Sequence, residues 1–408
     1  MKLNNYSLVS TTSLVYKLLL ILSLISALSF VSWFKVNNTP LFQLLLLFTI
    51  VVMLFMTRVT VPNLRPVKYY GVYLISSLLS VFIGILHNQQ EVLLVYFYSL
   101  MPFILFLTTY RYIDMSKFKY LLFSLSISIF LITLLGWTIR WEIIPFDYLF
   151  DQAKGSEFSL KYWGIRYEIS TRNGDYLYPL FGLALSLYFT KRKFFIYLNI
   201  FLTIFYIVTL FASLSRAATL MGIISLIFFI HNRKIVYFLI VLLIATFGFE
   251  NFSELYLTYN FDKILSSIFT IENISHQFSN EDRIDIIIKA LLASIYNPLG
   301  YGINNYSEIY AVMDYSGRVS NSAENAFLTI LVERGLISFI FFCLAIFSMY
   351  KDSFRSFEHA NFNKIILFFW VFYLFFNYEL NGVFFNFILY FIFLGHHLHM
   401  KQLKSNSI

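Results

Sequence analysis

Long apolar runs separated by short polar stretches follow one another along most of the chain. An α-helix needs about 20 mostly apolar residues to cross the hydrocarbon core of a membrane. Twelve runs fit this length, some at its short end, and Tyr and Trp are frequent at their ends, as at membrane interfaces. The runs lie near residues 17–34, 41–57, 69–87, 92–110, 120–138, 176–190, 194–213, 217–231, 235–249, 335–350, 365–378 and 384–398. The pattern predicts an all-α polytopic membrane protein with about twelve transmembrane helices.

Composition supports a membrane protein over a soluble one. The chain is 59% hydrophobic and only 13% charged, whereas a soluble domain carries about 25% charged residues. The net charge of +8 comes from basic residues in short loops, which favours a topogenic role over nucleic-acid binding. Cys343 is the only cysteine, which excludes a disulfide within the chain and a cysteine-based metal site.

The distribution of charge predicts the orientation of the helices. Every second turn between the apolar runs is basic, whereas the turns between them are not. Because cytoplasmic loops carry an excess of Lys and Arg, this alternation predicts both termini in the cytoplasm. We therefore treat residues 1–408 as a single polytopic membrane domain with its odd-numbered turns outside.

Two of the predicted outer turns are long. They span about 139–175 and 250–334 and are rich in Tyr, Asn and Ser. Connections in compact domains are usually short, and long ones are often functional. The sequence therefore predicts that these two loops form the active-site region.

Arg216 follows Ser213-Leu214-Ser215 at the outer end of the seventh predicted span. A planar guanidinium group suits a phosphate or a diphosphate. The alternative is an arginine that anchors the helix end by reaching toward the interface. Position alone leaves both interpretations open.

Arg283 begins a stretch that has the pattern of a helix. On an outer helix lying across the bundle, Arg283 could project toward a site at the membrane surface. The alternative is a local ion pair with Asp282 or Asp285.

A turn with two glycines and a polar pair come next. Gly300 and Gly302, in Pro298-Leu299-Gly300-Tyr301-Gly302, could let backbone amides approach a phosphate, or could simply make a tight turn. Glu324 and Asn325 precede an apolar helical run. Glu324 is a candidate general base at the membrane surface, or a capping acid stabilised by the helix dipole.

The histidines near the C-terminus are the one tract that suggests a metal. His396, His397 and His399 lie at the predicted inner end of the last span, and no carboxylate is close in sequence. We interpret them as an interfacial helix end and expect neither a metal site nor a cofactor. Charged residues are nearly absent from the spans, which is unlike the proton relays of carriers.

In this order, the residues resemble the motifs of the bacterial O-antigen ligase and O-antigen polymerase superfamily. That family typically shows Ser-x-Ser-Arg at the end of a span, an arginine-led helix, Pro-Leu/Phe-Gly-x-Gly, and His-Asn with a glycine eleven residues after the histidine. The matching residues here are Ser213 to Arg216, Arg283, Pro298 to Gly302, Asn325 and Gly335. The chain departs from the pattern at Glu324, which occupies the histidine position.

The resemblance implies a GT-C-like membrane glycosyltransferase of the bacterial plasma membrane that uses undecaprenyl-diphosphate-linked oligosaccharides at the outer face. In ligases of the superfamily the histidine is taken to activate the lipid A–core acceptor, so Glu324 favours a polymerase. The alternatives are an O-antigen ligase, a lipid-linked oligosaccharide flippase or other carrier, and a structural membrane protein. A chain-length regulator and a flippase are candidate partners.

The resemblance also implies roles for individual residues. Arg216 and Arg283 would stabilise the leaving diphosphate, and Glu324 would accept the proton of the attacking hydroxyl. The implied substrate-binding residues are Asn325, Gly300 and Gly302, together with Arg166 and Arg172 of the first large loop.

Overall fold

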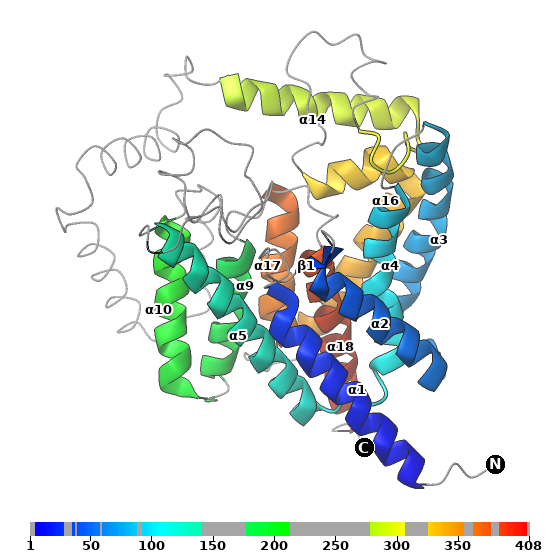
Figure 1. Ribbon diagram of the computed structural model, residues 1–408. Helices are drawn as coiled ribbons and strands as arrows, with labels where there is room; N and C mark the ends of the chain where they lie inside the picture. The colour runs from blue at the N-terminus through cyan, green and yellow to red at the C-terminus, as the bar shows by residue number, and fades with distance from the viewer. Residues whose placement is uncertain are drawn as a thin grey trace, which may run out of the picture. The chain divides into compact units, whose positions relative to one another are not determined.

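The computed structural model describes residues 5–27, 35–36, 39–57, 59–87, 92–140, 143, 177–191, 193, 195–212, 278–306, 325–354, 362–376 and 383–405 (Figure 1). Of the predicted site residues, Asn325, Gly300 and Gly302 lie within these ranges. Arg283 is described only by its backbone, and Arg166, Arg172, Arg216 and Glu324 lie outside the described residues.

The described part of the chain is helical apart from one pair of two-residue strands. The helices are α1 (Asn5–Ile25), α2 (Leu41–Met56), α3 (Arg65–Leu86), α4 (Val92–Thr109), α5 (Met115–Arg140), α9 (Leu177–Lys191), α10 (Ile196–Ala212), α14 (Phe278–Tyr296), α16 (Ala326–Phe354), α17 (Phe362–Phe376) and α18 (Val383–Ser405). The strands β1 (Lys35–Val36) and β2 (Thr39–Pro40) pair antiparallel, with Lys35 opposite Pro40. The predicted all-α class is confirmed.

Apolar runs predicted the helices well, with one clear shift. The runs within the described residues coincide with helices, and those near 217–231 and 235–249 lie outside the described residues. The run predicted at 17–34 is misplaced, because α1 begins at Asn5 and ends at Ile25. Hydroxyl side chains in a helix can bond its own carbonyls, as Ser23 Oγ does to Leu19 O at 2.7 Å. The Ser- and Thr-rich start of α1 is helical despite its low hydropathy.

Four of the described helices are long and apolar enough to cross a membrane. They cover Arg65–Leu86, Val92–Thr109, Met115–Thr138 and Ala326–Ser353. On α3 the outward-facing side chains are large and apolar, with Ile75 69%, Phe82 63% and Leu86 80% exposed. Such side chains suit lipid contact rather than water.

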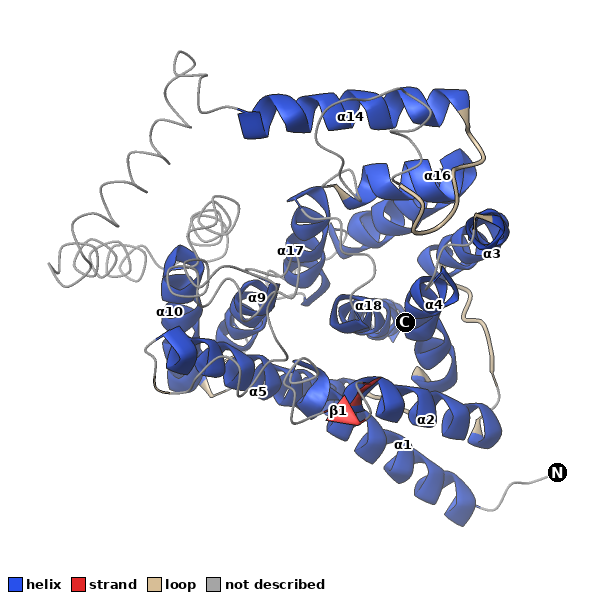
Figure 2. Cartoon of the chain, turned by 45° about the horizontal axis from the view of Figure 1, so that its top comes forward, coloured by secondary structure: helices blue, strands red, loops and turns tan. Residues whose placement is uncertain are grey.

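The chain divides into two compact units, which we describe separately. The first comprises residues 1–131, 148–151 and 283–408, and the second comprises 132–147 and 152–282. In the first unit, α16 packs along α3, and α4 packs against α18 (Figure 2). Aromatic rings from α3, α4 and α18 fill that core, where Tyr70 meets Phe393 with 5.2 Å between ring centroids.

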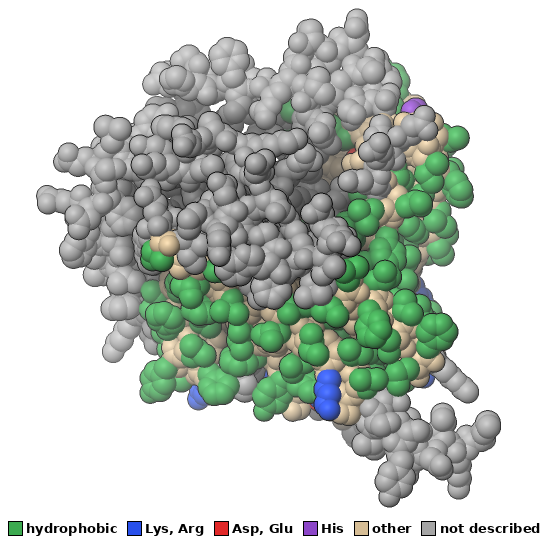
Figure 3. Space-filling view, viewed as in Figure 1, with side chains coloured by type: hydrophobic (Ala, Val, Ile, Leu, Met, Phe, Trp, Pro, Cys, Tyr) green, Lys and Arg blue, Asp and Glu red, His purple; other side chains and the backbone are tan. Residues whose placement is uncertain are grey.

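In the second unit, α9 packs against α10. Gly182 on α9 lies directly against the ring of Tyr206 on α10, so a larger residue at position 182 would displace that ring. Trp137 Nε1 donates a hydrogen bond to Thr209 Oγ1 at 3.0 Å, which joins the end of α5 to α10. The described side chains that are visible in Figure 3 are predominantly hydrophobic.

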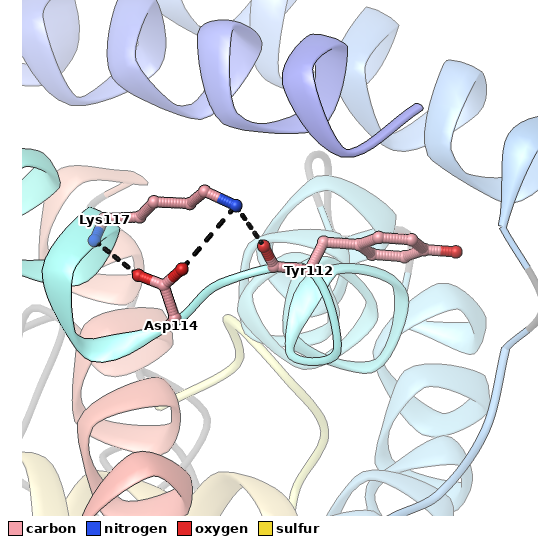
Figure 4. A network of polar contacts seen from close by, with 3 residues as sticks. All are labelled: Tyr112, Asp114 and Lys117. Atoms are coloured by element: carbon pink, nitrogen blue, oxygen red, sulfur yellow. Dashed lines mark hydrogen bonds and ion pairs between the residues drawn. The ribbon is translucent and has the colours of Figure 1, made fainter. Parts of the chain in front are cut away.

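The turn between α4 and α5, one of the predicted basic inner turns, is closed by local polar contacts (Figure 4). Asp114 Oδ1 accepts a hydrogen bond from the backbone N–H of Lys117 at 2.8 Å, which caps the start of α5. Lys117 Nζ lies 3.7 Å from Asp114 Oδ2 and donates to the carbonyl of Tyr112 at 3.3 Å. This exposed acid is therefore explained by helix capping.

Candidate functional site

The helix predicted after Arg283 is confirmed as part of α14, which is packed onto the start of α16. Ile286, Ala290 and Ala293 of α14 form a buried cluster with Val332 of α16 and Tyr306 of the connecting loop. The spacing of the three α14 residues places them on one face of the helix. The two alanines allow a close approach between the helices.

Arg283 occupies a defined place on this helix. It precedes Ile286 by about one helical turn, so position 283 lies on the same side of the helix as Ile286, Ala290 and Ala293. The backbone therefore sets Arg283 at the end of the face that packs toward α16. Its contact with a diphosphate stays a prediction.

The glycine-containing turn after α14 is bonded along its length to the bend in α16. Tyr301 N donates to Val332 O at 2.9 Å, Gly302 N donates to Glu333 O at 3.1 Å, and Leu336 N donates to Pro298 O at 2.8 Å. These bonds satisfy backbone groups of α16 where its regular hydrogen bonding is interrupted. The turn and the bend form one joint.

Each of the three glycines in this joint has a positive φ, at +91° for Gly300, +99° for Gly302 and +81° for Gly335. A Cβ on Gly300 would lie 2.6 Å from Glu333 O, and one on Gly335 would lie 2.5 Å from Leu299 O. Only glycine fits such contacts at these dihedral angles. Packing therefore explains Gly300 and Gly302. Their predicted substrate contact stays a prediction, and it would require amides that already donate to protein carbonyls.

Gly335 divides α16 into two parts. Its φ of 81° and ψ of 170° are not helical, and the helix changes direction there (Figure 1). The long apolar part runs from Leu336 to the end of the helix, and the short part, from Ala326 to Arg334, packs under α14. The joint thus fixes the direction in which the start of α16 points.

Asn325 caps this short part of α16. Its Oδ1 accepts hydrogen bonds from the backbone N–H groups of Phe327 at 2.9 Å and Leu328 at 3.2 Å. Its Nδ2 donates to Phe375 O, near the end of α17, at 3.1 Å. Capping is therefore performed by Asn325, and the predicted contact between Asn325 and the substrate stays a prediction.

Sequence reasoning missed Arg334, which is a buried cation in the first unit. Its side chain donates from Nη1 to Tyr73 Oη at 2.6 Å and from Nη2 to Ser99 Oγ at 3.0 Å. Arg334 is 3% exposed, and its guanidinium carbon lies 5.4 Å from the centre of the Tyr73 ring. It therefore ties the bend in α16 to α3 and α4.

Glu333, the neighbour of Arg334, contacts a different part of the protein. Its side chain is buried, and the backbone N–H groups of Asn304 and Tyr306 hydrogen bond to its carboxyl group. Glu333 thus holds the loop after α14, while Arg334 holds α3 and α4. The signal for both was the adjacent pair of charges inside an otherwise apolar stretch, which is costly in a membrane unless both are bonded.

Two of the three histidines, His396 and His399, are buried against the rest of the protein, and the interfacial position of this helix end stays a prediction. His396 is fully buried, and its Nε2 lies 3.6 Å from Asp352 Oδ2 of α16, a carboxylate that is distant in sequence. Within the described residues, no group of three or more His, Cys, Asp or Glu side chains could hold a metal ion.

Comparison with known proteins gives one match. Residues 201–343 match the family model described as O-antigen ligase. The matched segment includes α14, the glycine joint and the start of α16, together with the positions of Arg216 and Glu324. No curated protein and no solved structure matches the chain.

Proposed function

We propose that this protein belongs to the O-antigen ligase and polymerase superfamily and is a polysaccharide polymerase. It joins undecaprenyl-diphosphate-linked oligosaccharide repeat units at the outer face of the bacterial plasma membrane, for O-antigen, capsule or exopolysaccharide. The observation that carries the proposal is the glutamate at position 324, inside the matched segment, where ligases of the superfamily have histidine.

The reaction is a glycosyl transfer between two lipid-linked saccharides. A hydroxyl of the acceptor repeat unit attacks the anomeric carbon of the growing glycan, and the bond from that carbon to the lipid diphosphate breaks. Glu324 takes the proton of the hydroxyl, and Arg216 and Arg283 stabilise the charge on the departing diphosphate. Arg166 and Arg172 bind the saccharide or its anionic groups.

The joint between α14 and α16 supports this assignment through geometry. It fixes the helix that carries Arg283 against the helix that begins directly after Glu324 and Asn325. Groups that act together in catalysis must be held close to their productive positions by rigid neighbours. Buried Glu333 and Arg334 hold the joint in place, because Glu333 bonds to the loop after α14 and Arg334 bonds to α3 and α4.

The second candidate is an O-antigen ligase, favoured by the description of the matching family. A ligase transfers a finished polymer to the lipid A–core, whereas a polymerase extends the polymer on its lipid carrier. A lipid-linked oligosaccharide flippase or another carrier is disfavoured by the two long predicted outer loops.

Deleting the gene in its native strain is expected to leave single repeat units on the lipid A–core or on the cell surface. A plasmid carrying the wild type should restore the ladder of polymer lengths, and one carrying Glu324→Ala should not, because the attacking hydroxyl loses its base. Electrophoresis of the surface glycans measures both results. Arg65→Ala, at an exposed position at the start of α3, is the control and should restore the ladder.

Two outcomes would contradict the proposal. If the deletion strain accumulates full-length polymer on its lipid carrier with none on the core, the protein is a ligase. If the strain keeps its ladder, the protein does not polymerise the glycan.

A further inference from the structure

The second half of α14 is mostly apolar, with Lys289 and Ser294 as its polar residues. Its buried face carries Ile286, Ala290 and Ala293. The opposite face is also apolar, and its side chains Ile288, Leu291, Leu292, Ile295 and Tyr296 are 50%, 44%, 43%, 73% and 75% exposed. A helix on the surface of a soluble domain would have a polar outer face. This exposed apolar face is therefore suited to contact with lipid and not with water.

The turn that follows α14 shows how deep the helix end lies. Ile303 N donates to Ser80 O at 3.1 Å, and a Cβ on Gly302 would lie 2.6 Å from Gly84 N. Ser80 lies about six residues before the end of α3, which is roughly 9 Å along the helix axis. The turn therefore packs against the side of the span α3, before the C-terminal end of that helix.

The surface of α3 around this contact is a lipid-facing one. Phe82 is 63% exposed and Leu86 is 80% exposed, on a helix long and apolar enough to cross the membrane. Leu299, in the turn itself, is 54% exposed. Exposed apolar surface thus continues from the span α3 through the turn to the exposed face of α14.

We propose that α14 is an interfacial membrane helix whose exposed face is inserted among the acyl chains of the outer leaflet. The occupant of this face is the phospholipid of the bilayer. Apolar area buried among acyl chains stabilises a helix that lies in the plane of the membrane, while its polar part stays at the headgroups. In α14 the polar part is the first half, which contains Arg283 and Asp285.

This placement has a consequence that rests on the proposed function. Lipid immersion of the second half of α14 holds Arg283 near the depth of the phospholipid phosphates. A diphosphate attached to a membrane-embedded prenyl chain lies at a similar depth. The arginine therefore meets its substrate at the interface, and no part of the lipid has to leave the membrane.

The test uses the full-length protein in a Cys343→Ser background, which leaves no other thiol. Ile295→Cys is labelled with an environment-sensitive fluorophore and reconstituted in phosphatidylethanolamine–phosphatidylglycerol vesicles. Quenching is measured with acyl-brominated phospholipid and, separately, with aqueous iodide present on both sides of the vesicle membrane. Phe82→Cys on α3 is the lipid-facing control, and Lys193→Cys in an exposed turn is the aqueous control.

We expect the label at position 295 to lose fluorescence to brominated lipid as the label at position 82 does, and to resist iodide. Quenching by iodide to the level of position 193 would place the face in water and overturn the proposal. Protection from both quenchers would mean that another part of the chain or a second copy covers the face, which also overturns it. A label at Leu292→Cys repeats the test if Ile295→Cys does not fold.

These measurements do not depend on catalysis. Lipid quenching in a protein that forms no polymer would refute the polymerase alone, whereas polymer formation with a label open to iodide would refute the interfacial helix alone.

Discussion

Replacing Arg334 by alanine is expected to lower the free energy of unfolding by about 3–5 kcal/mol, the cost of removing one partner of a buried charged pair. The change removes the donors to Tyr73 and Ser99 and leaves their hydroxyl oxygens buried with one partner fewer. It also leaves buried Glu333 without the positive charge beside it. Thermal unfolding of the detergent-solubilised protein, followed by tryptophan fluorescence, measures the loss as a lower apparent Tm.

A control substitution at another arginine and a double substitution test whether the loss of stability comes from the contacts of Arg334. Arg65→Ala, at an exposed position, should change stability by no more than about 0.5 kcal/mol. Tyr73→Phe should destabilise the wild type but cost much less in the Arg334→Ala protein, because the shared hydrogen bond is already lost. Additive effects of the two substitutions, or an unchanged Tm for Arg334→Ala, would show that Arg334 does not hold the bend.

Arg283→Ala is expected to reduce the rate of polymerisation by about 100-fold or more, as the loss of one preorganised charge-stabilising group does in other enzymes. The leaving lipid diphosphate gains negative charge as its bond to the sugar breaks, and the guanidinium group offers two parallel donors to it. Arg283→Lys keeps the charge but loses that geometry, so it should recover only part of the rate. Initial rates on isolated lipid-linked repeat units measure the effect.

Lys289→Ala is the control on the same helix. It changes the charge of α14 by the same amount, about two turns from position 283, and should leave the rate within severalfold of wild type. Equal losses in the two variants would mean that the net charge of α14, and not a specific contact of Arg283, matters. Wild-type activity of Arg283→Ala would remove Arg283 from the site.

Most of the helices were predictable because the membrane dictates their length and composition. An apolar run such as 92–110 has few other stable structures in lipid, and α4 matches it closely. The start of α1 was missed because its Ser and Thr residues lower the hydropathy without preventing a helix. The mostly apolar run from Ile286 to Leu292 was sufficient to predict a helix there, and α14 covers it.

The joint between α14 and α16 could not be predicted from local patterns. It depends on contacts between residues distant in sequence, such as Gly84 with Gly302 and Gly300 with Glu333. The short Gly-x-Gly motif left a phosphate-binding turn and a simple tight turn open, and neither interpretation indicated the close backbone contacts that these glycines make. Arg334 was overlooked for a related reason, since its partners Tyr73 and Ser99 come from the first quarter of the chain.

The most direct test of the polymerase is reconstitution of the purified protein in vesicles with the lipid-linked repeat unit isolated from the deletion strain. The account predicts lipid-linked chains of increasing length, with one undecaprenyl diphosphate released for each bond formed. Mass spectrometry of the lipid extract measures both products. Absence of chain growth, with transfer only when lipid A–core is added, would contradict the polymerase and identify a ligase.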